Sequence, residues 1–271
     1  MQIIERTFSG NEDLEVMTEL VRKFPTENLH VVDLPYRLSS WSFDFPDNIH
    51  LWSDENDQLL AWAVLQISFW KIDYAYHPEI QHTLHPQILK WANKQARKIV
   101  DTPSGHPAWF VPALASQADR IHDLEQIGFA SQENVGEDSW SQVLMEHSMQ
   151  IPNDVNLPDR FHIRPLNGAG EVDAYVDLHQ AVFQSKNMTM EWRQRTLQRP
   201  EYISDLDLVI AASNGQLAAF CICWLAQDMN GEIRGQIEPL GVHADFRKLG
   251  LGKAILTEGL KRLSAKGAKQ I

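Results

Sequence analysis

The stretch that decides the fold is Arg247-Lys248-Leu249-Gly250-Leu251-Gly252. It follows an apolar, strand-like run (residues 237–242) and precedes a helix-like run (residues 253–263). Two alternating glycines at such a junction can turn several backbone N–H groups toward one point, with the positive end of the helix dipole behind it. The arginine and the lysine add positive charge. The stretch therefore predicts a phosphate or pyrophosphate site; a glycine turn without a ligand is the alternative.

Two better-known phosphate-binding loops are excluded by the residues that follow. A P-loop needs Gly-Lys-Ser/Thr to hold magnesium, but Gly252-Lys253 is followed by Ala254. A dinucleotide-binding turn needs a third glycine where Ile255 stands, and an acidic residue about 20 positions further on, where this sequence has ended.

The loop instead resembles the R/Q-x-x-G-x-G/A signature of the GNAT (Gcn5-related) N-acetyltransferases. The flanks agree: residues 238–246 resemble the fourth strand of that fold and its exit, and residues 252–267 the helix that follows. The resemblance implies acetyl-CoA as acyl donor, without a metal. It places the cofactor on Leu240, Gly241, Val242, Arg247, Lys248, Leu249, Gly250, Leu251, Gly252 and Lys253.

The resemblance also implies chemical roles. The loop amides would hold the pyrophosphate, the strand at residues 240–242 would align the pantetheine, and the Val242 N–H would donate to the thioester oxygen. Gly241 is expected to mark a β-bulge that lets the cofactor in. Glu238 is the candidate general base, because an alkylammonium is only about one part in 10³ neutral at pH 7; a solvent-facing structural glutamate is the alternative. His243 is expected to be structural.

Composition narrows the class of protein. The chain has 271 residues and a formal charge of −12, from 36 acidic and 24 basic residues. This balance argues against nucleic acid as a partner and weakly favours a cationic amine. We expect no signal peptide and no membrane span. The only cysteines, Cys221 and Cys223, are expected to be buried, reduced and without a metal, which suits a cytoplasmic protein.

The chain repeats itself loosely. Gln216-Leu217-Ala218-Ala219-Phe220 resembles Gln58-Leu59-Leu60-Ala61-Trp62, and each run follows a hairpin signal, Asn214-Gly215 or Asn56-Asp57. The second copy has eight more residues between its third and fourth strands. We therefore expect an α/β (α+β) protein of two tandem GNAT-like domains, each a mixed, mostly antiparallel sheet flanked by helices. The predicted division is a degenerate domain (1–150), a linker (151–160) and a catalytic domain (161–271).

Helices are expected from periodicity. In the first copy, Ser9 or Asn11 is expected to cap a helix with an apolar stripe at Val16, Leu20 and Phe24. The first copy should then continue through a short strand (109–111), a helix (117–127) and a strand pair ending near Met149. The second copy, with a helix carrying Val172, Val176, Leu178, Val182 and Phe183, is expected to be truncated after its third helix. Either the natural protein is longer or a partner segment comes from elsewhere.

Two functions remain open. The first is an N-acetyltransferase acting on a small amine, or on a protein amine, by direct attack; its tandem plan is similar to that of mycothiol synthase. The second is a non-catalytic acyl-CoA-binding or sensory protein. In the first copy the aligned loop (residues 77–86) has no glycine, contains Pro86, and carries Ile72 at the Glu238 position, so this half is expected to serve packing, acceptor shaping or homodimerisation. Phe183, Trp192 and Tyr202 are candidates for an acceptor pocket, and core packing explains them equally well.

Overall fold

The computed structural model of the chain describes residues 2–25, 30–135, 143–147, 153, 155–228 and 230–271. The chain folds into two compact units, of which the first comprises Met1–Leu29 and Ser42–Met145 and the second His30–Trp41 and Glu146–Ile271. The path therefore enters the second unit early, for twelve residues, and then returns to the first. The predicted linker, residues 151–160, lies partly outside the described residues, so the predicted domain boundaries stay a prediction.

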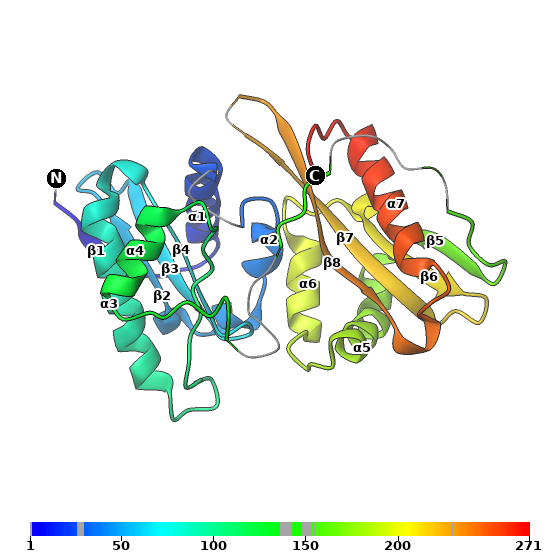
Figure 1. Cartoon of the computed structure of the whole chain (residues 1–271), viewed down its shortest axis with the longest axis horizontal. Coiled ribbons are helices and arrows are strands. Elements are labelled where there is room, and N and C mark those ends of the chain that lie inside the picture. The colour runs from blue at the N-terminus through cyan, green and yellow to red at the C-terminus, as the bar shows by residue number, and fades with distance from the viewer. Residues whose placement is uncertain (1, 26–29, 136–142, 148–152, 154, 229) are drawn as a thin grey trace. The chain divides into compact units, whose positions relative to one another are not determined.

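The first unit is an antiparallel sheet with helices beside it (Figure 1). Its strands lie in the order β1-β2-β3-β4. Its elements are β1 (Ile4–Thr7), α1 (Asn11–Lys23), β2 (Ile49–Ser53), β3 (Leu59–Gln66), β4 (Lys71–Tyr76), α3 (Gln81–Ile99) and α4 (Ala118–Gln126).

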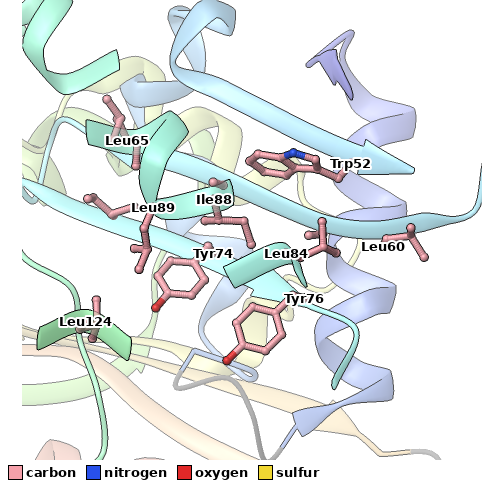
Figure 2. Close-up of a cluster of buried hydrophobic side chains, with 13 residues drawn as sticks. Trp52, Leu60, Leu65, Tyr74, Tyr76, Leu84, Ile88, Leu89 and Leu124 are labelled. Atoms are coloured by element: carbon pink, nitrogen blue, oxygen red, sulfur yellow. The ribbon is translucent and has the colours of Figure 1, made fainter. Parts of the chain in front are cut away.

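The core of the first unit forms where α3 and α4 meet β3 and β4 (Figure 2). The α3 residues Leu84, Ile88 and Leu89 are fully buried against strand side chains such as Leu65. Each fully buried aliphatic side chain contributes about 1.5–3 kcal/mol. This packing stabilises the first unit.

The second unit repeats the plan, with strand order β5-β6-β7-β8, all antiparallel. Its elements are α2 (Leu34–Arg37), β5 (Phe161–Pro165), α5 (Val172–Phe183), α6 (Met190–Gln198), β6 (Asp207–Ala212), β7 (Leu217–Gln227), β8 (Ile233–Val242) and α7 (Leu251–Ala265). Short 3-10 turns in the chain lie at Trp41–Asp44, Pro46–Asn48, Pro78–Ile80, Gly168–Glu171, Ser204–Leu206 and Ala244–Phe246. Two four-stranded antiparallel sheets flanked by helices confirm the predicted fold class.

The two faces of the second sheet are covered by different helices. A Cβ on Gly259 of α7 would meet the sulfur of Cys223 at 2.8 Å, so α7 packs closely on that face. On the other face the ring of Phe220 contacts that of Tyr175 in α5. Both cysteines are buried and free, as predicted, with their sulfurs 3.7 Å apart.

The predicted hairpins are confirmed. Asp57 (φ +63°) turns the chain between β2 and β3, and Gly215 (φ +86°) turns it between β6 and β7. The additional residues of the second copy lengthen the β7–β8 hairpin, whose pairing extends to Gln227 and Ile233.

Two details of α1 were predicted wrongly. The helix follows Gly10, not a capping Ser9 or Asn11; instead the Asp13 carboxylate accepts hydrogen bonds from the Ser9 N–H (2.6 Å) and hydroxyl (2.8 Å). The buried face carries Met17, and Val16 is exposed. A four-residue spacing predicts an apolar stripe that is rotated away from the buried face of the helix, because an α-helix repeats every 3.6 residues.

The ends of the two copies differ. In the first, Phe110 makes a single parallel bridge to Lys71 in place of the short strand, and α4 fits the predicted helix. The predicted strand pair ending near Met149 lies partly outside the described residues, and the described residues 130–135 and 143–147 contain no strand. In the second, Gln270 makes a parallel bridge to Arg234 of β8. This bridge lies where the sequence predicted that a fifth strand begins.

Candidate active site

A one-residue bulge shapes β8, the strand on which most of the candidate site lies. Cys221 of β7 pairs with Leu240 and Cys223 with Ile237, so four residues of β8 oppose three of β7. The extra residue falls at Glu238-Pro239, where proline has no N–H to donate. The indole N–H of Trp224 donates to the Glu238 carbonyl oxygen at 2.8 Å and holds the bulge.

This bulge corrects the expectation for Gly241. Gly241 pairs regularly with Phe220. Its lack of a side chain has a packing reason, because a Cβ there would meet Val182 Cγ1 at 2.6 Å and the Phe220 ring at 2.7 Å. The glycine therefore lets α5 approach the strand.

The bulge decides which backbone amides face the outer edge of β8. Before it, the Gly235 N–H points outward and donates to Gln270 O at 2.8 Å. After it, the His243 N–H points inward and donates to Ala218 O at 2.9 Å. Because amides alternate along a strand, Leu240 and Val242 present their N–H groups to the outer edge. These are two of the groups that the sequence assigned to the cofactor.

The loop that follows β8 has an unusual backbone. Lys248 (φ +64°) and Gly250 (φ +80°) both adopt the left-handed region, with Leu249 between them. The first hydrogen bond into α7 runs from the Ala254 N–H to Gly250 O at 3.0 Å. In the described part of the chain, no acceptor is found for the N–H groups of residues 248–253. Such a set of free amides at a helix N-terminus suits an anion.

The side chains around the loop add positive charge and leave room for a ligand. Arg247, Lys248 and Lys253 are exposed. The Arg247 Nε lies 3.4 Å from the Val242 carbonyl oxygen. A Cβ on Gly252 would touch only Val242 Cγ2, at 3.4 Å, so this glycine is not required by packing within the protein.

Glu238 is exposed on the bulge, and the Gln236 side-chain amide donates to its Oε2 at 3.1 Å. The carboxylate is therefore accessible and oriented by a neighbour on the same strand. His243, by contrast, is used locally: its Nδ1 accepts from the Asp245 N–H at 3.2 Å and caps the turn Ala244–Phe246. This hydrogen bond is in keeping with the structural role expected of His243, which stays a prediction.

Sequence reasoning missed a buried polar cluster beneath α5 and α6. Arg193 forms an ion pair with Asp207, whose Oδ2 also accepts from the Tyr202 hydroxyl at 2.7 Å. Burial raises the pKa of Asp207, and the cation and the hydroxyl oppose that rise. Burial and the Arg193 charge lower the pKa of His179 to about 4. The aromatic spacing of Tyr175, His179 and Phe183 was the only signal for this cluster.

The three aromatic residues predicted to line an acceptor pocket differ in their exposure. Trp192 is 1% exposed and belongs to the core, whereas Phe183 is 48% exposed at the end of α5. Tyr202 is half-buried and tied to Asp207. Their role toward an acceptor stays a prediction.

The first unit has a different arrangement at the matching place. His85 is buried, not at a loop rim: its Nε2 lies 2.9 Å from the Tyr74 hydroxyl and its Nδ1 3.0 Å from Asp123 Oδ2. Pro86 lies inside α3, and Ile72 is part of the apolar core. A cavity of about 260 Å³ lies beside Tyr76 and the start of α4.

Comparison with known proteins finds a family match for the carboxyl-terminal part of the chain. Residues 172–271 match the acetyltransferase (GNAT) family. This region is a GNAT acetyltransferase domain. The match spans α5 to α7, and so includes β8 and the glycine loop, which confirms the family that the sequence resembles.

Solved structures show the same fold over the whole chain. A GCN5-related N-acetyltransferase from Sphaerobacter thermophilus is 14% identical, with a TM-score of 0.59, over 99% of this chain and 84% of that one. A GCN5-related glucosamine N-acetyltransferase region of a fungal multi-domain GH3 β-N-acetylglucosaminidase is 14% identical, with a TM-score of 0.53, over 99% of this chain and 35% of that one. At such identities the likeness concerns the fold alone. No curated protein sequence matches the chain.

The described residues contain no group of three or more His, Cys, Asp or Glu side chains arranged to hold a metal ion. None of their helices combines the length and the apolar character needed to cross a membrane.

Proposed function

We propose that the GNAT domain transfers an acetyl group from acetyl-CoA to the amine of a small molecule, in the cytoplasm. The observation that carries the proposal is the run of unbonded N–H groups at residues 248–253, beside the outward amides of Leu240 and Val242. One set suits a pyrophosphate and the other an extended amide-bearing chain. Acetyl-CoA would bring both groups and supply the acetyl carbon that the acceptor attacks.

The residues of the site would then have separate roles in the reaction. The loop amides and Lys248 would hold the anionic end of the donor, and the Val242 N–H would donate to the carbonyl oxygen as negative charge develops there. Glu238 would take a proton from the acceptor ammonium, so that the free amine forms the new N–C bond while the C–S bond breaks and the thiolate leaves. The exposure of Glu238 leaves its carboxylate open to an amine from solvent.

The test is thiol release from acetyl-CoA with a panel of amines, run beside calorimetry of acetyl-CoA binding. Glu238→Gln should lower turnover by about 10² or more and leave acetyl-CoA affinity nearly unchanged, because it removes the base and keeps the shape. Glu232→Gln, an exposed glutamate on the same hairpin, is the matched control and should behave as wild type. Wild-type turnover in Glu238→Gln would return Glu238 to a structural role. Acetyl-CoA binding without turnover on any amine would favour the sensory alternative.

A further inference from the structure

The early excursion of the chain into the second unit brings one aromatic side chain next to Trp224 of β7. Residues His30–Trp41 belong to the second unit although they precede most of the first. All four residues of α2 (Leu34–Arg37) are buried. A segment this short, with no periodic pattern of its own, is buried because other elements of the second unit pack on it.

Two tryptophan side chains fix the segment by hydrogen bonds. The Trp192 indole N–H of α6 donates to Tyr36 O at 3.0 Å. The Trp41 indole N–H donates to Asn187 O at 3.0 Å. The segment is thus bound at its middle and at its end, and its position follows that of α6.

Tyr36 reaches from this segment to the sheet. Its ring lies 5.1 Å from the Trp192 ring and 6.5 Å from the Trp224 ring, between centroids. Its hydroxyl lies 3.3 Å from His179 Nε2 of α5. Such ring pairs add to the stabilisation that comes from the area they bury. Tyr36 therefore ties α5 and α6 to one tryptophan of β7.

That tryptophan is the one that holds the bulge. Trp224 is 1% exposed. Its indole N–H donates to Glu238 O. Burial raises the pKa of Tyr36, and the negative charge of Glu238 adds to this rise.

We propose that Tyr36 is a positioning residue for the acetyltransferase site, acting through Trp224 on the β8 bulge that carries Glu238. The proposal rests on the proposed role of Glu238. It means that the amino-terminal half of the chain supplies part of the support for the catalytic strand. Tyr36 itself is buried, so its role would be to position other residues.

The first experiment needs no substrate. Hydrogen exchange of the full-length chain would be compared at residues 236–242, around the bulge, and at residues 161–165 of β5. Tyr36→Leu should raise exchange around the bulge at least tenfold relative to β5, whereas Tyr36→Phe, which keeps the ring, should behave as wild type. The control Leu208→Ala truncates a buried β6 side chain and should not raise bulge exchange selectively. Unchanged relative exchange in Tyr36→Leu would overturn the proposal.

The second experiment is a double-mutant cycle on turnover with an accepted amine. Tyr36→Leu should lower kcat at least tenfold in the wild-type background and less than threefold in Glu238→Gln, because a residue that acts through Glu238 has little left to support once the base is gone. An equal loss in both backgrounds would show a merely structural role and overturn the proposal. Should wild type acetylate no amine at all, the proposed function would fail, and the exchange measurement would still decide the role of Tyr36.

Discussion

Glycine at two neighbouring positions of the loop meets two different demands. Gly250 has φ +80° and open space around its Cα, so it is needed for backbone conformation. Gly252 lies in the first turn of α7 and has only ordinary contact around a built Cβ, so nothing within the protein requires it. A ligand that approaches the backbone at this position would explain why the residue is glycine.

We expect Gly252→Ala, and more strongly Gly252→Val, to weaken acetyl-CoA binding at least tenfold, about 1.4 kcal/mol. Thermal stability of the alanine variant should change little or rise slightly, because alanine favours a helix more than glycine does. Calorimetric titration and a melting curve measure the two effects. Unchanged affinity in the folded variant would refute the loop assignment.

Gly250→Ala has a matched control in Gly215→Ala. Both glycines adopt the left-handed region (φ +80° and +86°) and have nothing within 4 Å of a built Cβ, but Gly215 lies in the β6–β7 turn. Both substitutions should cost about 1–2 kcal/mol of unfolding free energy, measured in urea. Only Gly250→Ala should also weaken acetyl-CoA binding. Equal affinities in the two variants would remove the loop from the donor site.

Among the elements, β8 and α5 depend on each other through Gly241. Gly241→Ala would place a methyl group within 3 Å of Val182 and Phe220, so we expect a loss of about 1–3 kcal/mol in urea unfolding. Val182→Ala in the same molecule should restore part of that loss, because it removes one of the clashing atoms. Simple additivity of the two losses would show that α5 does not press on the strand here.

The strand β8 and the residue Tyr36 show how much of the structure could be predicted from the sequence. The sequence predicts the strand, the loop and α7 within a few residues, because alternating apolar residues and glycine spacing are local signals. It puts the bulge at Gly241 and not at Glu238-Pro239, because a bulge is defined by pairing with β7, which no local pattern encodes. For the same reason it could not find Tyr36, whose role depends on contacts with residues more than 140 positions away.

For the whole molecule we expect one tight acetyl-CoA site per chain. In the first unit Pro86 lies within α3 and His85 is used inside the core, and the aligned residues 77–86 contain no glycine, so we expect this unit to bind acetyl-CoA less tightly than the second. Calorimetry should give about one bound acetyl-CoA per chain, and Gly252→Val should remove this tight binding. A stoichiometry of two would contradict this division between the units.

Stability of the molecule should fall in mild acid, in part through His179. Its pKa is about 4 when folded and ordinarily 6.5, so between these values the unfolded chain binds a proton that the folded chain does not. Unfolding free energy should therefore decrease as pH falls from about 6.5 to about 4, by up to about 3 kcal/mol from this group. Urea titrations of wild type and His179→Gln across this range measure it; above pH 7 the two slopes should agree. Equal slopes below pH 6.5 would exclude the effect.

The bulge in β8 has a consequence at the level of the gene. The bulge is one extra residue in β8, so removing one codon at positions 238–239 would restore regular pairing with β7 and keep the N–H groups of Leu240 and Val242 on the outer edge. Removing two codons would leave β8 one residue short of β7, and these two N–H groups would turn inward. We therefore expect the one-codon deletion to keep donor binding and the two-codon deletion to abolish it even where the fold survives.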